Sequence, residues 1–106
     1  MDINHNLIKG CPLCDIFLDP KKHIHTKVYY PEYHLIQSSD FIILECETTK
    51  TPMVILRDHV ASPSKTIWGN ILQVCRHEFG YPLRLRNKPR RVIDHYSCYI
   101  ILKKEY

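Results

Sequence analysis

The 106-residue sequence predicts one α+β domain, in which an antiparallel sheet of about five strands packs against one main helix. Three observations favour this fold class. Segments with strand-like patterns lie on both sides of one helix-like segment. The connections between these segments are short, as in hairpins, and no repeat or linker divides the chain. Apolar residues make up 44% of the sequence, which is close to the average for globular proteins. The chain is therefore long enough to bury one modest hydrophobic core.

The first half of the chain predicts loops followed by strands. Residues 1–10 are expected to form a loose lead-in. Residues 19–33, which are rich in Lys, His, Pro and Tyr, predict a long loop or an irregular excursion. Strands are predicted at residues 33–37, 41–46 and 52–56. The last of these is continuously apolar, as expected of a strand covered on both faces, and residues 48–51 provide a hairpin connection before it.

The second half predicts the main helix and two more strands. Ser62 and Ser64 offer capping hydroxyls around a proline suited to the first helical turn. Apolar side chains then recur at helical spacing, polar ones occupy the other face, and Gly80 ends the helix. The apolar positions are Trp68, Leu72, Cys75 and Phe79, and the polar ones are Asn70, Gln73, Arg76 and His77. Residues 83–86 alternate like a half-exposed strand, and residues 95–102 form the last strand.

Composition excludes several classes of protein. Three glycines are too few for a glycine-rich nucleotide-binding loop. Apolar runs are far shorter than the roughly 20 residues of a membrane span, and the start of the chain lacks the features of a signal peptide. We therefore expect a cytoplasmic protein that does not act at a membrane.

The net charge is +4, and the basic residues are unevenly distributed. One segment without acidic residues contains Arg84, Arg86, Lys88, Arg90 and Arg91. Such a basic segment suits a phosphate-bearing ligand, a nucleic acid or an acidic protein surface. The simpler interpretation is a solvated hairpin.

Five cysteines separate into two kinds. Cys46, Cys75 and Cys98 stand alone in apolar segments and are predicted to be buried as small hydrophobic side chains. Cys11 and Cys14 form a Cys-x-x-Cys pair, which is typical of structural zinc sites and also of redox pairs. No strand is predicted before the pair, which favours zinc held at a tight turn. Two of the seven histidines, His59 and His95, lie at predicted element boundaries and are the best further ligands.

These motifs resemble the histidine triad (HIT) superfamily. The similarity rests on the Cys-x-x-Cys pair, the Ile-Leu-Arg-Asp-His segment at residues 55–59 and the closing His-Tyr-Ser-Cys-Tyr-Ile-Ile segment at residues 95–101. A more distant similarity connects the chain to galactose-1-phosphate uridylyltransferases. The resemblance implies a HIT-like fold and a structural zinc ion with four ligands, which are Cys11, Cys14, His59 and His95.

The resemblance also implies that the catalytic chemistry is lost. Ser97 and Tyr99 occupy the second and third triad positions, and the Gly-Gln that precedes the triad in the family is replaced at Arg90 and Arg91. An imidazole is a competent nucleophile near neutral pH, whereas a serine needs a general base. The segment between His59 and His95 is also short for the family's dimerisation helix, which puts a HIT-type dimer in doubt.

We therefore expect a catalytically degenerate HIT-like domain that acts as a binding or regulatory module. Its ligand would bear phosphate, as a nucleotide or nucleic acid does, and would contact the five basic residues together with Ser97 and Tyr99. The alternative is a protein-interaction module that presents residues 19–33, of the kind a phage or virus encodes as a regulator. A third hypothesis is a residual nucleotidyl hydrolase or transferase that uses Ser97.

Overall fold

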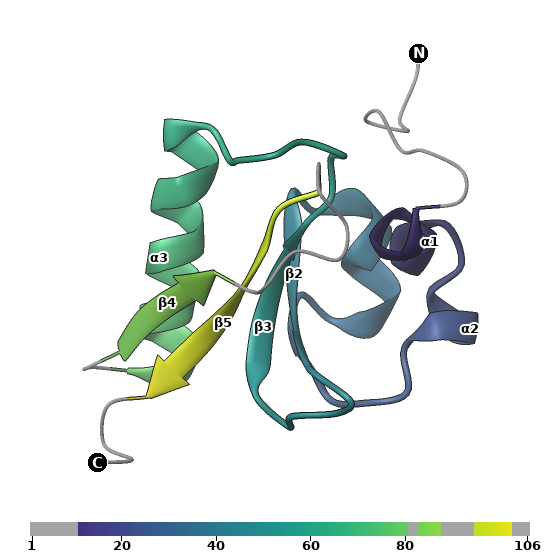
Figure 1. The fold of residues 1–106 in the computed structure, drawn as a ribbon, viewed down its shortest axis with the longest axis horizontal. Coiled ribbons are helices and arrows are strands. Elements are labelled where there is room, and N and C mark those ends of the chain that lie inside the picture. Colours follow the sequence, from purple (N-terminus) through teal and green to yellow (C-terminus); the bar gives the residue numbers. More distant parts are fainter. Residues whose placement is uncertain (1–10, 81–82, 88–94, 103–106) are drawn as a thin grey trace.

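The structure is a computed structural model that describes residues 11–80, 83–87 and 95–102. It is an α+β fold with an antiparallel sheet and one main helix, as the sequence predicts (Figure 1). In chain order, the elements are α1 (Pro12–Leu18), α2 (Pro20–His23), β1 (Val28–Tyr30), the 3-10 helix η1 (Tyr33–Ser38), β2 (Phe41–Glu45), β3 (Pro52–Leu56), α3 (Lys65–Phe79), β4 (Leu83–Asn87) and β5 (Ser97–Leu102).

The strands lie in the order β1-β2-β3-β5-β4, and every neighbouring pair is antiparallel. Phe41 pairs with Leu56, and Ile55 pairs with Ser97. The start of β2, the end of β3 and the start of β5 therefore meet at one end of the sheet. The short strand β1 joins the edge of β2 with an irregular register.

The sheet is covered on both faces. Figure 1 shows α3 on one side of it and α1 on the other. On the α1 side, Phe17 and Ile36 pack against Ile42 of β2 and Ile55 of β3. On the α3 side, Ile71 and Cys75 belong to a second cluster that includes Ile43, Val54, Cys98 and Ile100 of the sheet. The prediction that residues 52–56 form a strand buried on both faces is therefore confirmed.

Helix α3 begins and ends where the sequence signals indicate. The Ser64 side chain caps it by accepting a hydrogen bond from the backbone N–H of Ile67 at 3.2 Å. Gly80 follows the last turn with φ +74°, a conformation that favours glycine. The buried stripe is centred on Ile71 and Cys75, whereas Trp68, Leu72 and Phe79 are only partly buried at its margins.

Three predictions about the remaining segments are wrong. Residues 33–37 lie in η1 and not in a strand, and residues 19–33 contain α2 and β1 instead of one long loop. The last strand begins at Ser97, so His95 and Tyr96 precede it. The lead-in at residues 1–10 lies outside the described residues. Among the helices that are described, none combines the length and the apolar character needed to cross a bilayer.

Candidate metal centre

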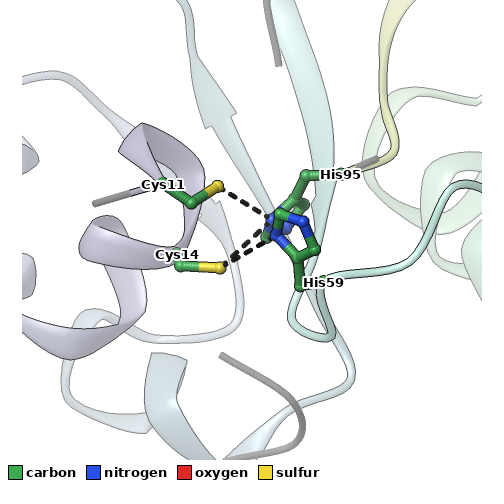
Figure 2. Close-up of side chains that lie close together, drawn as sticks. All are labelled: Cys11, Cys14, His59 and His95. Carbon is green, nitrogen blue, oxygen red and sulfur yellow. Dashed lines mark hydrogen bonds between the residues drawn. The ribbon is translucent and has the colours of Figure 1, made fainter. Parts of the chain in front are cut away.

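Four side chains from three separate segments meet beside the sheet: Cys11, Cys14, His59 and His95. Cys11 and Cys14 come from the start of α1, His59 follows β3, and His95 precedes β5. Figure 2 shows both sulfur atoms directed at the two imidazole rings. The four candidate ligand atoms all lie within 4.8 Å of one another, so the cluster could hold a metal ion.

The two cysteines lie on the first turn of a helix and not in the tight turn predicted from the sequence. Cys11 is the N-cap of α1, and Pro12 occupies a first-turn position that needs no backbone N–H. Residues three apart on a helix share a face, so both thiols point the same way. Cys14 is fully buried and Cys11 nearly so.

The two histidines are placed by the pairing of β3 with β5. Because these strands are antiparallel, the residues that follow β3 lie beside those that precede β5. Backbone hydrogen bonds continue beyond the strands: Leu56 N–H donates to Tyr96 at 3.3 Å, and Tyr96 N–H donates to Val60 at 2.8 Å. The rings of His59 and His95 stand edge to face, with centroids 5.2 Å apart.

The ring nitrogens of His95 have distinct roles. Its Nε2 lies 2.6 Å from the carbonyl oxygen of Leu56, which can only accept a hydrogen bond, so the proton is on Nε2. The Nδ1 lone pair therefore faces the sulfurs. The side chain is 2% exposed, and burial lowers the pKa of His95, with the charge of His59 acting in the same direction. The hydrogen bond to Leu56 and the charge of Asp58 oppose this shift. The net effect favours the neutral imidazole, which is the form that binds metals.

Two of the four ligand atoms, His95 Nδ1 and Cys14 Sγ, each contact two others, which suits a cation at the centre of the cluster. His95 Nδ1 lies 3.6 Å from Cys11 Sγ and 3.4 Å from Cys14 Sγ, and Cys14 Sγ also lies 3.4 Å from His59 Nδ1. One nitrogen lone pair accepts one good hydrogen bond, so thiol protons do not satisfy this arrangement as well as a shared metal would. Both cysteines are free thiols.

Four of the other predicted site residues, Arg84, Arg86, Ser97 and Tyr99, lie on β4 and β5. Arg84 and Arg86 occupy positions of β4 that pair with Ile101 and Tyr99. Tyr99 packs against the core on the α1 side, and its hydroxyl lies 3.9 Å from Cys46 Sγ. Ser97 begins β5 and is partly buried. Lys88, Arg90 and Arg91 lie outside the described residues.

The remaining cysteines are buried, as predicted, but they differ chemically. Burial raises the pKa of Cys75 to about 12 and that of Cys98 to about 11. Burial also acts to raise the pKa of Cys46, but hydrogen bonds from the side chains and backbone of Thr48 and Thr49 lower it to about 6. This difference was not predicted from the sequence. The run of threonines after Cys46 was the available signal, because hydroxyls and turn amides stabilise a thiolate.

We expect Cys46 to react with iodoacetamide at neutral pH, with a rate that titrates with a midpoint of about 6. The thiolate is the nucleophile, so the rate should rise as pH increases through this pKa. Thr48→Val should move the midpoint upward, because the variant removes a hydrogen bond to the sulfur. Mass spectrometry of proteolytic peptides locates the label. Faster modification of Cys75 or Cys98 in the folded protein would contradict this assignment.

Comparisons with protein-family models, with curated proteins and with solved structures found no match. Function is therefore inferred from the residues of this chain and their arrangement.

Proposed function

We propose that this chain is a HIT-like domain that is stabilised by a structural zinc ion and serves as a binding module. The observation that carries the proposal is the meeting of two thiols and two imidazoles at the junction of α1 with the sheet. Cys₂His₂ is a common ligand set of structural zinc sites, which are tetrahedral and closed to solvent.

The distances support zinc. In a tetrahedral site with Zn–S bonds of about 2.3 Å and Zn–N bonds of about 2.0–2.1 Å, a sulfur and a nitrogen lie about 3.6 Å apart. Three of the four sulfur–nitrogen distances of the cluster are 3.4, 3.4 and 3.6 Å. The hydrogen bond from His95 Nε2 to a backbone carbonyl is the kind of partner that orients a zinc-bound histidine. All four side chains therefore fit one zinc ion, which would fix α1 to the sheet.

The geometry also argues against triad catalysis. A serine nucleophile at Ser97 needs a general base, and His95 is the nearest histidine in sequence. However, Nε2 of His95 is engaged by Leu56, and Nδ1 faces the two sulfurs. Neither nitrogen is available to take a proton from Ser97. The domain is therefore a binding module in this proposal, and not a nucleotidyl hydrolase or transferase.

We place a phosphate-bearing ligand, such as a nucleotide or nucleic acid, at the basic segment and the start of β5. Arg84 and Arg86 lie on β4, directly beside β5, and the chain between them and Ser97 contains Lys88, Arg90 and Arg91. Arginines bind phosphate through paired hydrogen bonds, and a concentration of positive charge increases the rate of encounter with an anion.

We expect the Arg90→Ala, Arg91→Ala double variant to bind a short single-stranded RNA or DNA more weakly than the unmodified chain. For each arginine–phosphate pair that the variant removes, the dependence of log K on log salt should flatten by roughly one unit. Fluorescence anisotropy at several salt concentrations measures both effects. The Lys21→Ala, Lys22→Ala double variant removes the same charge from α2 and is the matched control. Equal weakening by the two variants would contradict a site at residues 84–91.

A protein-interaction role is the second candidate, and one observation favours it. Large apolar side chains are exposed at both ends of the segment 19–33: Leu18 is 45% exposed, and Tyr33 and Leu35 are 39% and 43% exposed. An apolar contact of this kind would be nearly independent of salt, whereas phosphate binding would weaken steeply. A partner captured equally well at low and high salt would favour this second role.

A further inference from the structure

Two adjoining hollows lie on the α3 side of the molecule, separated by Pro63 and Ser64. The first has a volume of about 390 Å³, and its lining includes Asp40 and Asp58. The second, of about 300 Å³, is bounded by Trp68, Tyr96 and Lys65. Ligand pockets span about 300–1,000 Å³, so both hollows lie at the lower end of this range, where a side chain or a small group fits.

Strand pairing explains why two aspartates line the first hollow. Asp40 precedes β2 and Asp58 follows β3, and the pairing of Phe41 with Leu56 brings these strand ends together. The backbone N–H of Arg57 donates to the carbonyl of Asp40 at 2.8 Å and holds the two segments in place. None of the described residues that line this hollow is basic. It is therefore an acidic site on a chain whose net charge is +4.

The second hollow has aromatic walls. The rings of Trp68 and Tyr96 stand edge to face, with centroids 6.5 Å apart, and both side chains are partly exposed. The backbone of Tyr96 is held by hydrogen bonds to Leu56 and Val60, and the backbone N–H of Trp68 donates to the carbonyl of Ser64 at 2.8 Å. Such a pair of rings offers apolar area to a flat or apolar side chain.

We propose that these hollows bind an extended peptide segment of a partner protein, which inserts a basic side chain between Asp40 and Asp58 and an apolar or aromatic side chain against Trp68 and Tyr96. Charge complementarity assigns the basic side chain to the first hollow. Lys65 at the second hollow repels a cation there and so sets the direction of the peptide. This site is on the α3 side of the sheet, so it does not depend on phosphate binding at residues 84–91.

Trp68 is the only tryptophan of the chain, so its fluorescence reports occupancy of the second hollow directly. The probe is a capped Arg-Phe dipeptide, and its matched control replaces arginine by citrulline, which has nearly the same shape and no charge. We expect a saturable change in Trp68 emission with the arginine peptide and about tenfold weaker binding of the citrulline peptide, because the citrulline peptide cannot form the charge-assisted hydrogen bond.

Variants test the acidic hollow. Asp40→Asn should weaken binding of the arginine peptide about tenfold and leave binding of the citrulline peptide unchanged. Asp40 is exposed, so this substitution should not disturb folding, which circular dichroism checks. Glu47→Gln removes the same charge from the turn at the other end of β2 and should bind like the unmodified chain.

Three results would overturn the proposal. The first is the absence of a saturable change in Trp68 emission at millimolar peptide, and the second is equal affinity for the arginine and citrulline peptides. The third is binding of arginine amide alone as tightly as the dipeptide, which would make the ligand a small cation and not a peptide. None of these results would bear on zinc or on the basic segment, because none of the described residues that line the hollows is a zinc ligand or a member of that segment.

Discussion

Cys14→Ser should abolish stoichiometric zinc binding and lower the free energy of unfolding by more than about 3 kcal/mol. Cys14 is fully buried, and its sulfur contacts both histidines, so no other described side chain can replace it. Metal binding to a preformed site contributes folding free energy directly. Because a loss of about 1 kcal/mol lowers the melting temperature of a domain of this size by roughly 4–8 °C, the variant should melt at least about 10 °C below the unmodified chain.

Elemental analysis of the purified protein identifies the metal and its stoichiometry, and thermal unfolding followed by circular dichroism measures the loss of stability. Cys46→Ser makes the same chemical change at a buried thiol outside the cluster, so it should retain the metal. A chelator should lower the melting temperature of the Cys46→Ser variant and leave that of Cys14→Ser unchanged. Stoichiometric zinc in Cys14→Ser, or a melting temperature of the unmodified chain that ignores the chelator, would rule out this site.

The elements that can be predicted from the sequence are those whose own residues specify a helix or a strand. β3 and α3 follow from a continuous apolar run and from an apolar stripe with a serine cap and a terminal glycine. β1 could not be predicted, because three residues of weak pattern become a strand only by pairing with β2. The pattern of Tyr33, Leu35 and Ile36 is typical of a strand. The backbone instead forms η1, and of these three side chains only that of Ile36 is buried in the core.

The residues of the candidate site also divide into those that the sequence predicts and those that it does not. The spacing of Cys11 and Cys14 alone indicates a metal site or a redox pair. His59 and His95 are indicated by the HIT resemblance and by their places at element boundaries. The structure brings all four together. The acidic hollow was not predicted, because Asp40 and Asp58 become neighbours only through the register of β2 and β3. The low pKa of Cys46 likewise depends on a turn conformation that the sequence does not specify.

The segments that hold the metal ligands also separate the two surfaces proposed for binding. The bend after β3 carries His59 toward α1, and its continuation to Ser64 lines the hollows on the α3 side. In the same way, His95 faces the cluster while its neighbour Tyr96 faces Trp68. A zinc ion would therefore restrict the motion of both segments at once and rigidify the walls of the hollows.

Phe17→Ala should destabilise the zinc-loaded protein by about 3–5 kcal/mol, and part of this cost should depend on the metal. Phe17 is 1% exposed and packs on the α1 side of the core with Ile36, Ile42 and Ile55. The seven-residue helix α1 is too short to be stable alone, so Phe17 and the cysteine ligands together hold it on the sheet. Without the metal, α1 is less firmly docked, and Phe17 contributes less to stability.

Denaturant unfolding of Phe17→Ala and of the unmodified chain, with and without chelator, gives the coupling between Phe17 and the metal, which we expect to be about 1 kcal/mol or more. The matched control is Phe79→Ala, since Phe79 packs on the opposite face through α3, and its cost should be the same in both conditions. Coupling is reciprocal, so Phe17→Ala should also weaken zinc affinity about fivefold in a competition with a chromogenic chelator. That second readout remains measurable if the metal-free chain is largely unfolded. Unchanged zinc affinity in Phe17→Ala would mean that the metal does not hold α1 against the sheet.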